Sequence, residues 1–239
     1  MEKEIELFKE EVSRQLDILE PSRGLANVGA FREKSQWALD NMKPKFHIAY
    51  GNYKLPKTTA IVNLGSWFNC PGRVEGFCEI CERCYDKSKE VMFKKISKAR
   101  YEQEVFMRSH DANEIADKII SSIKYQIFNG NNIKQIRFCE VGELRNQEDL
   151  EKIRDISDIV YNKLNIKSYI YTHNKYLDFS INHPNLTING SGFMVDNEYR
   201  VLQKGETYNE DHYDCLCDCK NGCNVCANKH GIIITEEVR

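Results

Sequence analysis

The sequence contains no apolar stretch that approaches the roughly 20 residues a membrane-spanning helix needs. Its opening residues, MEKEIELFKEEV, are charged throughout, which is unlike a secretory signal. An excess of either charge is also missing, because 34 Lys and Arg face 36 Asp and Glu. The formal net charge of −2 excludes a bulk electrostatic binder of nucleic acid, although it is compatible with a local basic patch. We therefore expect a cytoplasmic protein with no membrane partner.

The sequence also lacks a Gly-rich phosphate loop, a nucleophile elbow and an HExxH zinc motif. It has no internal repeat and no low-complexity tract. Its 239 residues are 41% hydrophobic and 29% charged, a mixture that builds a sizeable core and excludes wholesale disorder. The length fits one large domain or two small ones. Whether the chain is an enzyme stays open on these grounds.

Strand and helix patterns alternate along the chain. Apolar and β-branched runs predict strands at residues 58–64, 134–141, 167–172, 186–189 and 231–235. Apolar side chains three or four apart predict helices at residues 4–19, 86–107, 112–128 and 147–164, whereas residues 21–56 look less regular. This alternation is the rhythm of βαβ units, and it is too short for a closed eight-stranded barrel. The expected fold is α/β, with a partial βα barrel or an open, mostly parallel sheet and cysteine-rich metal-binding loops.

Ten cysteines are the most informative feature of the composition. Four lie between Cys70 and Cys84, five lie between Cys215 and Cys226, and Cys139 stands alone. Because cytosolic thiols are kept reduced, clustered cysteines there indicate metal ligands. We expect three segments: an N-terminal helical extension (1–56), an α/β core with the first cysteine loop (57–205) and a C-terminal cysteine-rich segment (206–239).

The first cysteine group consists of Cys70, Cys78, Cys81 and Cys84. Its C-x2-C-x2-C spacing brings three thiolates out of one tight loop, as in bacterial ferredoxins, and favours a [4Fe–4S] cluster. Zinc, which also takes four thiolates, is the alternative. Cys70 is predicted as the fourth ligand, because a free thiol beside a reactive cluster is an oxidation hazard. With four thiolates the cluster would transfer electrons or support structure.

The second cysteine group consists of Cys215, Cys217, Cys219, Cys223 and Cys226. Cys219, Cys223 and Cys226 form a C-x3-C-x2-C pattern, and Cys215 or Cys217 is predicted as the fourth ligand. A second iron–sulfur cluster or a zinc ion fits this segment. As a further alternative, the two cysteine groups are neighbours in space and share metal ligands.

Polar residues follow the predicted strands at their carboxyl ends. Gly142 and Glu143 follow the second strand, Thr172 ends the third, and Ser191 follows the fourth. In a parallel sheet these ends share one edge, where ligands bind. Ordinary turn chemistry explains each residue singly, but the set together predicts a site.

A cysteine loop after the first strand, with Gly-Glu after the second, resembles the radical S-adenosylmethionine superfamily. The resemblance implies that Cys78, Cys81 and Cys84 hold a [4Fe–4S] cluster whose open iron binds S-adenosylmethionine, and that Gly142 and Glu143 contact this cofactor. Thr172 and Ser191 complete the predicted cofactor-binding set. The superfamily's usual spacing is C-x3-C-x2-C, whereas the first gap here is two residues.

A closer resemblance joins several short motifs in order. They are Leu64-Gly65 before Cys70-Pro-Gly, Cys84-Tyr85, Gly142-Glu143, Tyr171-Thr172, Ser191 and the C-terminal cysteines. Over residues 58–228 this order is similar to the gene product 88 family of phages and mobile elements. The resemblance implies a phage-type protein and no particular chemistry.

The segment Lys87–Arg108 is the most basic part of the chain. Its seven cations are Lys87, Lys89, Lys94, Lys95, Lys98, Arg100 and Arg108. They predict either a strip that binds nucleic acid or a solvated helix face. Two hypotheses follow: an iron–sulfur protein resembling radical enzymes, or a non-enzymatic, zinc-stabilised module that binds nucleic acid or protein.

Overall fold

The computed structural model describes residues 1–22, 24–78, 80–208, 211–215 and 219–237. The chain divides into two compact units that interleave along the sequence. The helical unit comprises residues Met1–His47, Asn63–Asp111 and Val141–Glu143, and the sheet unit comprises Ile48–Val62, Ala112–Glu140 and Leu144–Arg239. The three segments expected from the sequence stay a prediction. No helix in the described ranges has the length and apolar character needed to cross a membrane.

The helical unit is built around one aromatic and aliphatic core. Its helices are α1 (Glu2–Asp17), α2 (Val28–Asn41), α3 (Pro71–Val74), η1 (Cys81–Arg83), α4 (Tyr85–Met92) and α5 (Lys94–Ser109). Phe8, Val12 and Leu16 recur every four residues on α1 and are buried, as the pattern predicts. They share a cluster with Phe31 of α2 and Tyr101 of α5.

Two predictions for this unit were wrong. Residues 21–56 contain α2, whose first turn is capped by the Asn27 side chain accepting from the Ala30 N–H (2.9 Å). The single helix expected at 86–107 is two helices, because Phe93 between them has an extended backbone. The Ser97 hydroxyl donates to the Glu90 carbonyl (3.2 Å) and so satisfies one carbonyl left open where α4 ends.

The sheet unit contains an open, mostly parallel sheet, as predicted. The strands are β1 (Ala49–Tyr50), β2 (Thr59–Val62), β3 (Gln135–Phe138), β4 (Lys167–Thr172), β5 (Leu186–Ser191), β6 (Asn197–Leu202), β7 (Tyr213–Asp214) and β8 (Ile233–Glu237). Their order is β1-β2-β3-β4-β5-β6-β8-β7, and only the β1–β2 pair among these is antiparallel. The sheet is not closed into a barrel.

Strand β6 was not predicted, because it follows β5 without a crossover helix. The connection is a tight turn in which Gly192 has a φ of 82°. The Asp196 carboxylate accepts from the Ile188 N–H (2.7 Å) and holds this turn against β5. Strand β6 therefore pairs in parallel with β5 after a connection of five residues. The expected βαβ pattern predicts a longer, helical connection between parallel strands.

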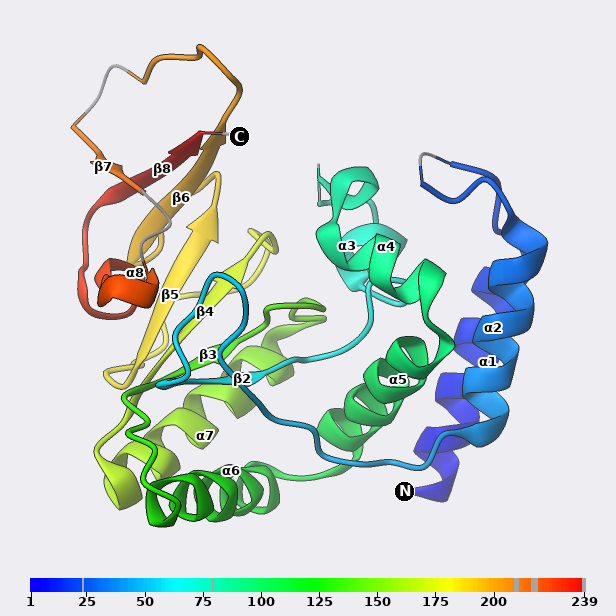
Figure 1. Ribbon diagram of the computed structural model, residues 1–239, viewed down its shortest axis with the longest axis horizontal. Helices are drawn as coiled ribbons and strands as arrows, with labels where there is room; N and C mark the ends of the chain where they lie inside the picture. The colour runs from blue at the N-terminus through cyan, green and yellow to red at the C-terminus, as the bar shows by residue number, and fades with distance from the viewer. Residues whose placement is uncertain (23, 79, 209–210, 216–218, 238–239) are drawn as a thin grey trace. The chain divides into compact units, whose positions relative to one another are not determined.

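The two faces of the sheet differ in chemistry. Helices α6 (Ala112–Phe128) and α7 (Gln147–Leu164) pack side by side, and α7 contacts β4 and β5 (Figure 1). On the other face, the strand register aligns Arg137 with Tyr169, Tyr171 with Asn189, and Asn189 with Asn197. We call this the polar face, made of Arg137, Tyr169, Tyr171, Thr187, Asn189 and Asn197. Short helix α8 (Val225–Asn228) packs on β4 and β5 there.

Candidate metal centres

The first cysteine group lies on a series of tight turns in the helical unit. Cys70 precedes α3 with Pro71 at the first helical position, and Cys84 precedes α4. Between them the chain folds back, because the Cys78 N–H donates to the Gly72 carbonyl (3.0 Å). A Cβ on Gly72 would lie 2.8 Å from that of Cys78, so glycine is required where these segments meet.

The four thiols of this group interact with one another. A hydrogen bond with Cys78, burial, and the charges of Cys78, Cys70 and Cys84 all raise the pKa of Cys81. Burial, Glu143 and Cys78 raise the pKa of Cys70. Crowded thiolates repel one another, and a bound cation would relieve this repulsion. All four residues predicted as ligands of the first site thus lie on one series of tight turns, with Cys70 and Cys78 both next to Gly72.

The thiols are not arranged as a finished metal site. The nine described cysteines form no disulfide bond with one another. Across the described ranges, no three His, Cys, Asp or Glu side chains form a group with metal-binding geometry. Main-chain N–H groups of Gly72 and Arg73 nevertheless favour the Cys70 thiolate by lowering its pKa against the effect of burial. The main-chain N–H groups of Asp86 and Lys87 likewise lower the pKa of Cys84 against the effect of burial. The first turns of α3 and α4 therefore favour an anionic sulfur.

Buried carboxylates of α4 and α5 fix the loop that leads into Cys70. Glu90 accepts from the N–H groups of Trp67 (2.6 Å) and Phe68 (3.2 Å). Glu104 accepts from the Ser66 N–H (3.1 Å) and the Asn69 side-chain amide (2.7 Å). Burial, followed by the charge of Asp86, raises the pKa of Glu90 to about 8, and burial raises that of Glu104. Each buried carboxyl costs free energy that its N–H donors offset, and the result is a rigid loop.

Gly142 and Glu143 belong to the same unit as the first cysteine group. Gly142 has a φ of 87° and packs on Gly65, and the neighbouring Val141 N–H donates to the Asn63 side chain (2.8 Å). Glu143 is buried, and its charge is the second largest cause of the raised pKa of Cys70. The predicted neighbourhood of the Gly-Glu pair and the first cysteine group is therefore observed.

Replacing Gly142 with Ala is expected to lower the free energy of unfolding by about 2–5 kcal/mol. An L side chain at positive φ costs about 1–2 kcal/mol, and overpacking adds about 1–3 kcal/mol. The new Cβ would lie 2.5 Å from the Gly65 nitrogen. Gly76→Ala is the matched control, because Gly76 has a φ of 77° with no atom within 4 Å of the added Cβ. Equal losses of stability in urea titrations of the two variants would show that the close approach is unimportant.

Thr172 and Ser191 lie in the sheet unit. The Thr172 hydroxyl accepts from the Asn174 N–H (3.0 Å) and so stabilises the turn that follows β4. Ser191 is the half-buried last residue of β5, paired with Tyr199. A cofactor-binding role for these two residues stays a prediction.

The second cysteine group lies in the sheet unit. Cys215 follows β7, Cys219 begins η2 (Cys219–Asn221), and Cys226 is on α8. Burial and the charges of Cys215, Cys219 and Cys223, opposed by the Tyr171 hydroxyl, raise the pKa of Cys226 to about 12. The charges of three other thiols therefore act on Cys226, and Cys217 lies outside the described residues.

Buried polar side chains of β5 and β6, which sequence reasoning missed, hold α8 on the sheet. Amide hydrogens of Asn189 bond to the Cys226 carbonyl (3.0 Å), and those of Asn197 bond to the Lys229 carbonyl (2.7 Å). The Thr187 hydroxyl donates to the Ala227 carbonyl (2.9 Å). The available signal was the alternation of Thr and Asn with apolar residues in LTINGS.

The basic segment is mostly committed to internal ion pairs. The Lys87 side chain is 4% exposed and pairs with Glu82 (2.6 Å), and the Arg100 guanidinium lies 3.2 Å from buried Asp86. Arg108 bridges the carboxylates of Glu104 (2.6 Å) and Glu11 (2.7 Å). Lys94 and Lys95 are exposed. Nucleic-acid binding by this segment stays a prediction, with fewer available cations than the sequence implied.

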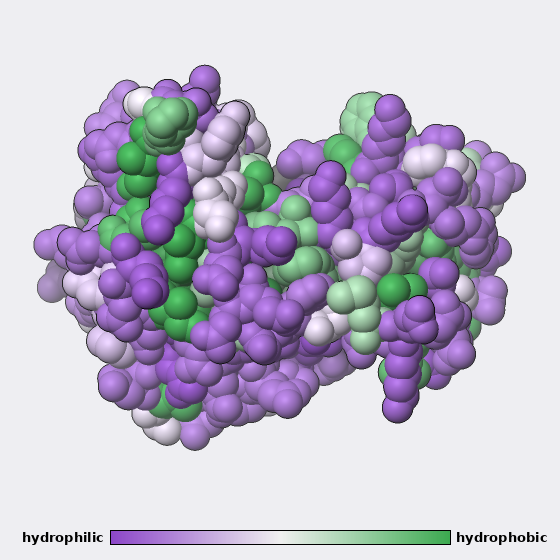
Figure 2. All heavy atoms as spheres, turned by 90° about the horizontal axis from the view of Figure 1, so that it is seen from below, coloured by the Kyte–Doolittle hydropathy of each residue, from purple (hydrophilic) through white to green (hydrophobic). Residues whose placement is uncertain are grey.

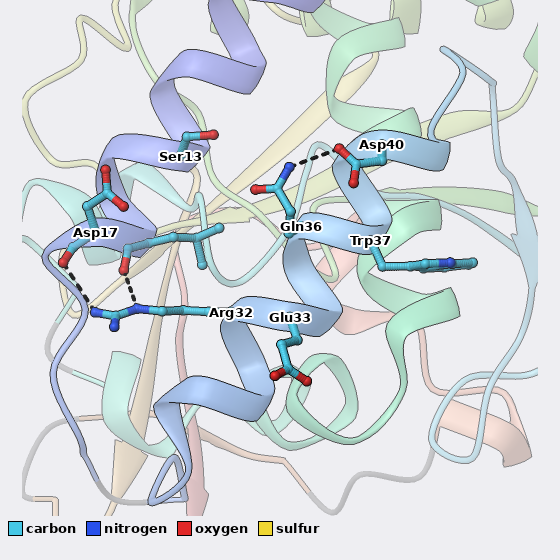
Figure 3. A pocket seen from close by; sticks show the side chains of 8 residues that line it. Ser13, Asp17, Arg32, Glu33, Gln36, Trp37 and Asp40 are labelled. Atoms are coloured by element: carbon cyan, nitrogen blue, oxygen red, sulfur yellow. Dashed lines mark hydrogen bonds between the residues drawn. The ribbon is translucent and has the colours of Figure 1, made fainter.

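An open groove of about 500 Å³ lies between α1 and α2 (Figure 3). Arg32 in this groove donates to the carbonyls of Leu16 (2.7 Å) and Leu19 (3.0 Å), and so completes the end of α1. Gln36 bonds to Asp40 (2.9 Å). The Arg32 contacts therefore tie the end of α1 to α2. The face of the molecule in Figure 2 is mainly hydrophilic, with apolar side chains in small patches.

Comparison with known proteins gave one match. The family model described as gene product 88 matches residues 28–228, a range that includes both cysteine groups. No curated protein and no solved structure matched the chain.

Proposed function

The chain belongs to the gene product 88 family, and we propose that its helical unit is an iron–sulfur module in which Cys70, Cys78, Cys81 and Cys84 hold a [4Fe–4S] cluster. The observation that carries this proposal is the folding of the four cysteines onto consecutive tight turns. The Cys81 N–H donates to the Cys78 carbonyl (3.4 Å), the Cys84 N–H donates to the Cys81 carbonyl (3.3 Å), and Cys70 and Cys78 both lie against Gly72. The phage or mobile-element character of the protein belongs to the same proposal, since it rests on resemblance.

The donor set fits an iron–sulfur cluster. Such clusters take Cys thiolates, and the two-residue spacings of Cys78, Cys81 and Cys84 are those of bacterial ferredoxins. A cluster with four thiolates accepts and returns an electron. The chain's part is to position the thiolates: N–H groups at the starts of α3 and α4 favour the anionic sulfurs of Cys70 and Cys84.

The surroundings of the loop support a preorganised site. Glu90 and Glu104 hold the main chain before Cys70, and the Trp67 indole donates to the Cys81 carbonyl (3.3 Å). Trp67 and Phe68 are buried beside the cysteines and keep water from that side of the loop. Hydrogen bonding and exclusion of water are the levers by which proteins tune cluster potentials.

A second candidate is S-adenosylmethionine chemistry of the radical type. The observation that favours it is the placement of buried Glu143 where its charge acts on Cys70. If Cys70 were not a ligand, one iron would be open beside the Gly142-Glu143 pair. The involvement of Cys70 in the thiol group makes the four-thiolate cluster the preferred proposal.

The test is anaerobic purification of the full chain, followed by iron, sulfide and zinc analysis. A brown protein that absorbs near 400 nm, a rough expectation for cluster thiolates, supports the proposal. A colourless protein with zinc in the first group supports a zinc-stabilised module that binds nucleic acid or protein. S-adenosylmethionine added to the wild-type protein should leave the cluster spectrum unchanged, and Cys70→Ala should respond. A wild-type response would instead favour the second candidate.

A further inference from the structure

The C-terminal part of the sheet unit has very little hydrophobic support. Between Gln203 and Ile232, Ala227 is the single buried apolar side chain among the residues that the structure describes. Segments with so small a core usually depend on a metal or a disulfide for their order. The described cysteines of this segment are free thiols.

The segment is attached to the sheet at two places. The Cys215 N–H donates to the Thr235 carbonyl (2.7 Å), which continues the pairing of β7 with β8. At the other end, Asn189, Thr187 and Asn197 bind the main chain of α8 and the residue after it. Cys215 and Cys226 lie at these two attachments, with Cys219 and Cys223 between them.

The four described cysteines have the spacing of a structural zinc site. Cys215 and Cys219 are separated by three residues, and Cys223 and Cys226 are separated by two. Both gaps lie within the range of two to four that is typical of paired zinc ligands. Between the pairs, Gly222 has a φ of 101° and its N–H donates to the Cys219 carbonyl (3.2 Å). This turn is one that a non-glycine residue adopts with strain.

Side chains of the polar face and Tyr213 of β7 supply hydroxyl donors and a positive charge near these thiols. The Tyr171 hydroxyl bonds to the Cys226 thiol, and the Tyr213 hydroxyl lies 3.8 Å from the Cys223 sulfur. The Arg137 guanidinium lies over the Tyr171 ring, 5.0 Å from its centre. A zinc ion with four thiolates carries a net negative charge, which a nearby guanidinium and hydroxyl donors stabilise.

We propose that Cys215, Cys219, Cys223 and Cys226 bind a structural zinc ion that fastens the C-terminal segment to the polar face, and that Tyr171 and Arg137 are positioning residues for its thiolates. The zinc replaces the missing hydrophobic core of this segment. Arg137 stacks on Tyr171, and the Tyr171 hydroxyl orients the Cys226 thiol. The Asn189 side chain holds helix α8 on the sheet by donating to the Cys226 carbonyl.

The proposal is tested on the full chain purified with zinc and iron present, with both metals measured on every sample. Cys223→Ala is expected to lose stoichiometric zinc and to become sensitive to limited proteolysis between residues 203 and 230. Tyr171→Phe keeps the ring and removes the hydroxyl donor. It is expected to fold and to bind zinc about 10–100-fold more weakly in chelator competition, as for other residues that support a ligand.

Tyr199→Phe is the matched control, because Tyr199 contacts the Tyr171 ring while its hydroxyl donates to Glu236. It should retain wild-type zinc affinity. Zinc retained in full by Cys223→Ala, or zinc affinity unchanged in Tyr171→Phe, would overturn the proposal. Loss of iron from Cys223→Ala would also overturn it, by showing a second cluster. The iron content of Cys78→Ala reports separately on the first cysteine group. The zinc proposal can therefore fail while the iron–sulfur proposal holds, and the reverse.

Discussion

Single replacement of Cys78, Cys81 or Cys84 with Ala is expected to remove most of the iron and sulfide bound by the protein. A cluster held by several thiolates loses most of its affinity when one is removed, and metal binding in such loops is coupled to folding. The structure adds a reason for the three to act together, since the Cys81 N–H donates to the Cys78 carbonyl (3.4 Å) and the Cys84 N–H donates to the Cys81 carbonyl (3.3 Å). The measurement is iron and sulfide content per chain, with the absorbance near 400 nm, a rough expectation for this cluster type.

Cys139→Ala is the control for these variants. Cys139 is also buried, but it follows β3 in the sheet unit, apart from both cysteine groups in sequence. Its replacement should leave iron unchanged. Wild-type iron content in Cys78→Ala, Cys81→Ala and Cys84→Ala would contradict the assignment of the first group as cluster ligands.

The elements predicted most accurately are those whose local signals agree. Helix α7 and strand β4 were predicted at residues 147–164 and 167–172 and have these bounds in the structure. The Asn146 side chain caps the start of α7 by accepting from the Asp149 N–H (3.0 Å), and Asn165 ends it in the left-handed region with a φ of 55°. Between these signals the apolar residues have helical spacing throughout, so local and tertiary preferences coincide.

The candidate sites were predictable in composition and only partly in placement. That Gly142 and Glu143 lie with the first cysteine group follows from parallel strands sharing a carboxyl edge. The role that we propose for Arg137 and Tyr171 was not predictable from the sequence, because it depends on the register of β3 against β4. Strand register is set by tertiary packing and cannot be inferred from the sequence of a single strand.

The basic segment shows how much a charge pattern leaves undetermined. Seven cations in 22 residues suggested a solvated face or a nucleic-acid surface. The structure pairs most of them with carboxylates, of which one is distant in sequence. Glu11 of α1 lies 97 residues from its partner Arg108. A local reading counts the cations of a segment but cannot see partners supplied by another helix.

Arg108→Met is therefore expected to destabilise the helical unit by about 3–5 kcal/mol, the cost of leaving a buried charge without its partner. The Arg108 side chain is 8% exposed and lies 2.6 Å from Glu104 and 2.7 Å from Glu11. Burial already raises the pKa of Glu104, and Arg108 is the largest influence opposing that rise. Without it, Glu104 must bind a proton or release the loop that leads into Cys70. The measurement is the free energy of unfolding from urea titrations at neutral pH.

Lys95→Met is the matched control, because Lys95 is exposed on the same helix and should change the free energy of unfolding by less than about 0.5 kcal/mol. The double variant Arg108→Met, Glu104→Gln removes the stranded charge together with its partner. It should be more stable than Arg108→Met alone, because contacting residues are energetically coupled. Equal stability of the two would show that the buried charge is not the source of the loss. A strip built to bind nucleic acid predicts the opposite ranking, in which Arg108→Met weakens binding and leaves the fold intact.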